Sequence, residues 1–146
     1  MNEKIYGIIA NEILKITSSN WKEIIFYGEF GEGSYEFEYY VNLGDNKFVK
    51  CFNLKDVSMM DILNLFKNIN NIISEERKKI SKDKLWTNCT LKFNKEGRFK
   101  MDFDYTDLSQ NSYVYHEVWK YKYLDEMPLK ENKIAFEAVN KYIREN

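Results

Sequence analysis

Residues 21–42 read WKEIIFYGEFGEGSYEFEYYVN, and this stretch decides the fold. Two runs rich in isoleucine and aromatic residues flank the short segment Gly31-Glu32-Gly33. Aromatic and β-branched residues favour strands, and a short glycine-containing linker joins antiparallel neighbours. The stretch therefore predicts a β-hairpin with strands over Trp21–Phe30 and Ser34–Asn42.

The second strand of this hairpin divides its side chains between two faces, because successive side chains of a strand point to opposite sides. One face is apolar and the other is mainly acidic. We expect the apolar face to pack in the core, and the acidic face, with an exposed Tyr40, to meet solvent or a partner. The apolar face carries Tyr35, Phe37, Tyr39 and Val41, and the acidic face carries Glu36, Glu38, Tyr40 and Asn42.

Outside this hairpin, apolar residues at three- and four-residue steps predict three amphipathic helices. A turn at Asn94-Lys95-Glu96-Gly97 predicts a second hairpin, and a run after Gly44 predicts one further strand. Ser58, with Asp61 three residues later, resembles a capping box at the start of the central helix. The helices are expected over Glu3–Ile16 (before the polar break Thr17–Asn20), Met59–Ile73 and Lys130–Arg144, and the strands over Lys47–Phe52, Trp86–Phe93 and Arg98–Tyr105.

Strands that occur in hairpins, rather than alternating singly with helices, predict an α+β fold. We expect one domain over residues 1–146, since this length is typical of a single domain. Its sheet is largely antiparallel with about five strands, two hairpins plus one strand, packed with N-terminal, central and C-terminal helices. Periodicity does not decide between helix and strand for Asn111–Leu124, whose tyrosines and tryptophan fit both patterns.

Composition and motifs exclude several classes of function. Lys and Arg number 22 against 23 Asp and Glu, so the basic excess of a protein that neutralises many phosphates is absent. No apolar run approaches the ~18–20 residues of a membrane span. The N-terminus lacks the pattern of a secretory signal, so we expect a cytoplasmic protein in which Cys51 and Cys89 are reduced thiols. We expect no cofactor, no metal, no direct nucleic-acid partner and no membrane.

Catalytic motifs are also missing from the sequence. His116 is the one histidine, and its aromatic surroundings favour a structural role over general-base catalysis. We therefore expect no enzymatic activity. One alternative stays open, because Asp102, Asp104 and Asp107 form the pattern D-x-D-x-x-D and three carboxylates could hold Mg²⁺ or Ca²⁺. That alternative function is a metal-dependent hydrolase.

Charge is distributed unevenly along the chain although it nearly cancels overall. Between Trp21 and Asp45 there is one base against six acids, which gives 1 − 6 = −5. Between Glu75 and Lys100 there are nine bases against four acids, which gives 9 − 4 = +5. An acidic strand face can attract a basic protein and then bind it by burying aromatic surface. The residues by themselves thus favour a binding module.

Seven segments spread along the chain resemble, in their order and spacing, the YezG-like antitoxins, small immunity proteins of polymorphic and type VII-secreted toxins in Gram-positive bacteria. The segments are Ile5–Ile13, Trp21–Glu23, Gly33–Glu36, Trp86–Leu91, Glu96–Phe99, Phe103–Leu108 and Trp119–Leu124 ahead of Pro128. The resemblance implies a helix for Asn111–Leu124. It also implies an immunity function, in which the chain binds a cognate toxin, often a nuclease, inside the producing cell. The basic linker Lys78–Lys84 departs from the acidic, proline-containing approach of the family.

A nuclease must be basic where it grips phosphate, so an acidic surface could dock there and exclude the substrate. Blockage of the toxin active site and binding elsewhere on the toxin both stay open, as does the oligomeric state. A third alternative is a scaffold domain that self-associates through the tyrosine-rich tail. As a hypothesis, the toxin-binding residues are Glu29, Glu32, Glu36, Glu38, Tyr40, Asp102, Asp104 and Asp107.

Overall fold

The structure is a computed structural model that describes residues 1–18 and 20–146. The chain divides into two compact units, Met1–Thr106 and Asp107–Asn146. Ser19, within the break predicted at Thr17–Asn20, lies outside the described residues. The first unit contains helices α1 (Glu3–Leu14) and α2 (Met59–Arg77), short 3-10 helices η1 (Cys51–Asn53) and η2 (Lys82–Lys84), and strands β1 (Glu23–Gly31), β2 (Ser34–Asn42), β3 (Phe48–Lys50), β4 (Asn88–Asn94) and β5 (Phe99–Asp104).

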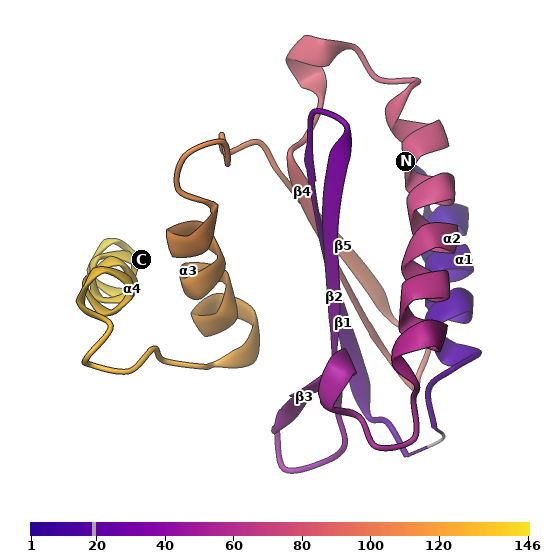
Figure 1. The fold of residues 1–146 in the computed structure, drawn as a ribbon, viewed down its shortest axis with the longest axis horizontal. Helices are drawn as coiled ribbons and strands as arrows, with labels where there is room; N and C mark the ends of the chain where they lie inside the picture. The colour runs from indigo at the N-terminus through magenta and orange to yellow at the C-terminus, as the bar shows by residue number, and fades with distance from the viewer. Residues whose placement is uncertain (19) are drawn as a thin grey trace. The chain divides into compact units, whose positions relative to one another are not determined.

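The five strands form one sheet in the order β3-β2-β1-β4-β5, and every neighbouring pair is antiparallel (Figure 1). The predicted α+β class and the two hairpins are confirmed. β1 and β2 pair without interruption from Glu23–Asn42 to Gly31–Ser34. Gly33 allows the tight turn between them, because its φ of 68° is a conformation that side chains disfavour. β3 is shorter than predicted, since the chain turns into η1 at Cys51.

The core of the first unit lies between one face of the sheet and helices α1 and α2, which run side by side (Figure 1). The sheet contributes Phe26, Tyr39 and Leu91, each fully buried. The predicted apolar face of β2 is buried at Phe37, Tyr39 and Val41, whereas Tyr35 is exposed at the hairpin end. From the helices, the fully buried residues are Ile9, Ile13, Ile62, Ile69 and Ile73.

Helix α2 begins where the capping pattern predicts. The Ser58 hydroxyl accepts a hydrogen bond from the backbone N–H of Asp61 at 3.1 Å, which satisfies one of the free N–H groups of the first turn. At the other end of α2, the guanidinium of Arg77 lies 4.4 Å from the ring centre of Phe30 and 4.6 Å from that of Trp86. It also donates a hydrogen bond to the carbonyl oxygen of Trp86. Both ends of α2 are therefore fixed by specific contacts.

The second unit consists of helices α3 (Ser112–Leu124) and α4 (Lys133–Glu145). The segment Asn111–Leu124, which periodicity left open, is helical, as the family resemblance implies. α3 is capped by Asp125, the next residue, which takes a left-handed conformation with a φ of 56°. The rings of Tyr121 and Tyr142 meet edge to face at 6.2 Å between the two helices. The prediction of a single domain over residues 1–146 stays a prediction.

Candidate functional site

The antiparallel register aligns residues of four strands in rows that cross the sheet. Because side chains alternate along each strand, these rows lie on the face opposite the buried Phe26, Tyr39 and Leu91. The first row is Glu36, Glu29, Asn88 and Asp104, and the adjacent second row is Glu38, Tyr27, Thr90 and Asp102.

Five predicted site residues therefore gather on one face at the hairpin end of the sheet, in a cluster that we call the acidic end. Its members are Glu29, Glu36, Glu38, Asp102 and Asp104. Glu32 follows at the same end, exposed in the β1–β2 turn. Asp107 is the first residue of the second unit and is not part of the paired rows.

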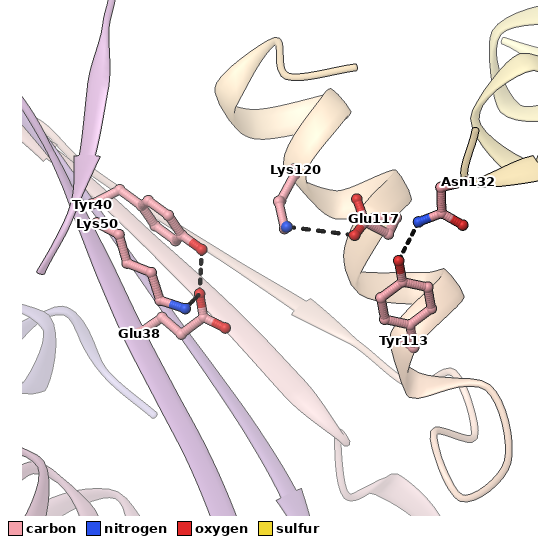
Figure 2. A network of polar contacts seen from close by, with 7 residues as sticks. All are labelled: Glu38, Tyr40, Lys50, Tyr113, Glu117, Lys120 and Asn132. Atoms are coloured by element: carbon pink, nitrogen blue, oxygen red, sulfur yellow. Dashed lines mark hydrogen bonds and ion pairs between the residues drawn. The ribbon is translucent and has the colours of Figure 1, made fainter. Parts of the chain in front are cut away.

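Repulsion is built into the acidic end. Glu29 and Glu36 stand directly opposite each other in the β1–β2 register, an arrangement that destabilises an antiparallel pair. Glu38 has two contacts that compensate its charge. It accepts a hydrogen bond from the hydroxyl of Tyr40, and the ammonium of Lys50 lies 3.7 Å from its carboxylate (Figure 2). The next row along the strands is Tyr40, Ile25, Lys92 and Lys100, so the charge changes sign there.

The exposure predicted for Tyr40 is wrong, since only 5% of this residue is accessible. Its neighbour in the row, Ile25, is fully buried, and Tyr27 is 1% exposed. The central strand β1 is apolar at consecutive positions and thus on both faces, which is typical of a strand buried on both sides. In the sequence, this run of consecutive apolar residues was the signal that the face carrying Tyr40 is buried. Tyr40 holds Glu38 instead of offering an exposed apolar anchor.

Two aspartates of the D-x-D-x-x-D pattern, Asp104 and Asp107, accept hydrogen bonds from residues two positions later in the chain. The carboxylate of Asp104 accepts hydrogen bonds from the backbone N–H and the hydroxyl of Thr106, at 2.7 and 2.5 Å. The carboxylate of Asp107 accepts from the backbone N–H of Ser109 at 2.9 Å, and this donation holds the pKa of Asp107 below its usual range. Within residues 1–18 and 20–146, no three His, Cys, Asp or Glu side chains are grouped so that they could hold a metal ion. The hydrolase alternative gains no support.

His116, the only histidine, lies in α3 of the second unit. Its ring stacks on Trp119 with the ring centres 5.2 Å apart and the planes 15° from parallel. Elsewhere on α3, Glu117 and Lys120 form an ion pair at 3.5 Å, and Tyr113 accepts a hydrogen bond from the side-chain amide of Asn132 (Figure 2). These contacts lie within or between the two helices of the unit, and they agree with a structural role for the aromatic segment.

A pocket of about 730 Å³ between the β1–β2 turn and the C-terminal end of α2 was not foreseen from the sequence. The half-buried Arg77 lines it, and burial lowers the pKa of this guanidinium. Lys78 and Lys82, from the basic linker, also line the pocket. The positive linker therefore borders the hairpin turn on the molecule, although the two segments are distant in the sequence.

In the described part of the chain, no helix combines the length and apolarity that crossing a bilayer requires.

The profile of the family described as immunity protein YezG-like matches residues 2–137. Immunity protein YezG of Bacillus spizizenii is 30% identical over 151 residues, which cover 97% of this chain and 92% of that protein. The type VII secretion system protein EsaG of Staphylococcus aureus is 26% identical over 160 residues, with 97% and 93% covered.

Immunity protein YezG of Bacillus subtilis is 23% identical over 145 residues, with 92% of this chain and 95% of that protein covered. The similarity thus extends over nearly the full length of each relative and is not confined to one motif. The order that the sequence predicts, a helix, three strands, a helix, two strands and a helical C-terminal part, is the order observed. The chain therefore belongs to the YezG-like immunity protein family, whose members act by binding a cognate toxin.

Proposed function

We propose that this immunity protein neutralises a secreted nuclease toxin by non-covalent occlusion, and that the acidic end of the sheet supplies the binding surface. The observation that carries the proposal is the convergence of five carboxylates from β1, β2 and β5 on one face, beside Glu32 in the hairpin turn. The chain itself makes and breaks no bonds in this function.

The negative charge of the acidic end favours binding to a positively charged nuclease surface. A nuclease needs positive charge where it grips the phosphate backbone, so its active-site surface is complementary to a cluster of carboxylates. Long-range attraction steers the two proteins together and raises the association rate, and occupancy then keeps nucleic acid out. Neutralisation in this way protects the producing cell from within, and we therefore propose that the protein acts in the cytoplasm.

The apolar part of the interface must come from residues other than Tyr40. Tyr35 is 40% exposed near the tip of the same hairpin, on the face of β2 opposite Glu36 and Glu38, and the centres of its ring and that of Phe37 are 4.7 Å apart. A tyrosine held in this way can bury apolar area against a partner at a low cost in side-chain entropy. We propose Tyr35 as the anchor in place of Tyr40, for a toxin surface that reaches from the acidic end around the hairpin tip.

Charge reversal tests the proposal. The double variant Glu32→Lys/Glu36→Lys reverses the charge of two exposed residues, one in the acidic end and one in the adjacent hairpin turn. Its binding to a catalytically inactive cognate toxin is measured by biolayer interferometry. We expect the association rate to fall by about tenfold or more and the dissociation constant to rise. The matched control is Glu75→Lys/Glu131→Lys, which makes the same change in net charge at exposed positions outside the region. Equal losses in both double variants, or none in either, would contradict the assignment of the acidic end.

The nuclease part of the proposal needs its own assay. The purified cognate toxin is incubated with DNA and with RNA, with and without one equivalent of this protein. We expect degradation of one nucleic acid and its suppression by the immunity protein. A toxin that cleaves neither would remove the nuclease assignment, while the binding measurements would still report on the acidic end.

A further inference from the structure

Strand β5 forms one edge of the sheet. It is the last strand in the order β3-β2-β1-β4-β5, so no strand of the described chain lies beyond it. The strand contains six residues, Phe99–Asp104, without a proline that would block pairing. An unpaired strand edge presents backbone donors and acceptors to any chain that can add to it.

Two hydrogen bonds determine which backbone groups face this edge. The N–H of Asn94 donates to the carbonyl of Arg98 at 3.2 Å, and the N–H of Phe30 donates to the carbonyl of Thr87 at 2.9 Å. Because bonded and non-bonded pairs alternate in an antiparallel ladder, the even-numbered residues of β5 bond to β4. The backbone groups of the odd-numbered residues, Phe99, Met101 and Phe103, therefore point outward.

Charged side chains on β5, and on Arg98 just before it, can pair with those of a second copy that runs antiparallel to the first. Arg98, Lys100, Asp102 and Asp104 share one face and read plus, plus, minus, minus. An antiparallel copy centred on Met101 places Arg98 opposite Asp104 and Lys100 opposite Asp102. Two-fold symmetry produces each of these pairs twice.

The register centred on Met101 also pairs the residues whose backbone groups point outward from β5. With Met101 opposite itself and Phe99 opposite Phe103, the outward-facing residues form the bonded pairs, which supplies about six backbone hydrogen bonds. The charged pairs fall at the non-bonded positions, where Cα atoms are about 4.5 Å apart and side chains lie closest. Phe99, which is 45% exposed, has apolar surface to bury in this arrangement.

The neighbouring registers lack this match. A centre at Asp102 sets two aspartates directly opposite each other, and a centre at Lys100 does the same with two lysines, which disfavours both. We propose that two copies of this immunity protein associate through antiparallel pairing of their β5 edges, with Met101 on the two-fold axis, so that the two sheets become one. A strand of the toxin is the other conceivable occupant, but it would have no reason to match a self-complementary pattern.

Variants with swapped charges test the proposal. Sedimentation equilibrium over a wide concentration range measures their mass, and a dimer has twice the 17.6 kDa mass of the chain. Lys100→Asp places aspartates opposite aspartates in both inner pairs, and Asp102→Lys places lysines opposite lysines. We expect each variant alone to dimerise at least tenfold more weakly than the wild type, in line with like charges in direct opposition. Lys84→Asp, at an exposed position off the edge, makes the same charge change as Lys100→Asp and should dimerise like the wild type.

Mixing the two single variants is the decisive step. In the mixed dimer each introduced charge faces an opposite one, so an equimolar mixture should recover dimers that neither variant forms alone. The double swap Lys100→Asp/Asp102→Lys should likewise recover the wild-type dimer, which rules out misfolding as the cause of the single losses. A wild type that stays monomeric at all concentrations, single variants that dimerise normally, or a mixture without recovery would each overturn the proposal. A dimer seen only when toxin is added would assign the edge to the toxin and overturn it too.

Discussion

Replacement of Glu36 by glutamine tests whether the acidic end of the sheet is retained at the expense of stability. Glu36 stands directly opposite Glu29, and like charges in this position destabilise an antiparallel pair by roughly 0.2–1 kcal/mol. Glutamine keeps the size and polarity of the side chain while it removes one of the two charges. We expect the free energy of unfolding to rise by about 0.5 kcal/mol. For a chain of 146 residues, this corresponds to a Tm higher by about 1–2 °C.

The same substitution should weaken toxin binding, because it removes charge from the proposed binding surface. Differential scanning calorimetry measures the Tm, and biolayer interferometry measures the association rate with the inactive toxin. The control is Glu75→Gln, which makes the same change in net charge. Glu75 forms an exposed ion pair with Lys78 at 2.9 Å, so its loss should alter stability by no more than about 0.5 kcal/mol and leave binding unchanged.

Salt provides an internal check on the cause. At about 1 M ionic strength, exposed charges are screened beyond about 3 Å, so the gain in Tm from Glu36→Gln should shrink. A Tm below that of the wild type at low salt would refute the repulsion argument, since it would mean that the Glu36 charge stabilises the sheet. A higher Tm with unchanged toxin affinity would keep the repulsion and remove Glu36 from the binding surface.

Three further predictions concern stability. Ser58→Ala removes the hydroxyl that caps α2 and should lower the free energy of unfolding by about 1 kcal/mol in urea titrations, whereas Ser58→Asp should retain it. Arg77→Met loses the hydrogen bond to Trp86 and the stacking on two rings, and should cost about 1–3 kcal/mol by the same measurement, against about 0.5 kcal/mol or less for Lys78→Met. Burial raises the pKa of Cys89 and that of Tyr39 each to about 12, so the unfolded chain loses these protons first. Stability should therefore be complete below pH 9 and fall as the pH rises towards 12, with a shallower fall in Cys89→Ala; urea midpoints that do not change with pH over this range would contradict this.

Local features of the fold followed from the sequence because short-range physics determines them. Alternation assigned the side chains of β2 to their faces, glycine at Gly33 supplied the turn, and the Ser58 hydroxyl set the start of α2. Each of these features depends on residues a few positions apart. For the same reason, periodicity failed over Asn111–Leu124, where helix and strand patterns coincide and no local residue decides between them.

The amino-acid sequence by itself determined the hairpins, the acidic face of β2, the pairing of Asp102 with Asp104 on one face of β5 and the membership of the family. Only the tertiary structure decided that β4 lies beside β1, and this pairing brings Asp102 and Asp104 into the same rows as Glu38 and Glu36. It also buried Tyr40 and left Asp107 in the second unit. The physical reason is that strand order and burial depend on contacts between segments about 60 residues apart, which propensity and periodicity, being local, do not encode.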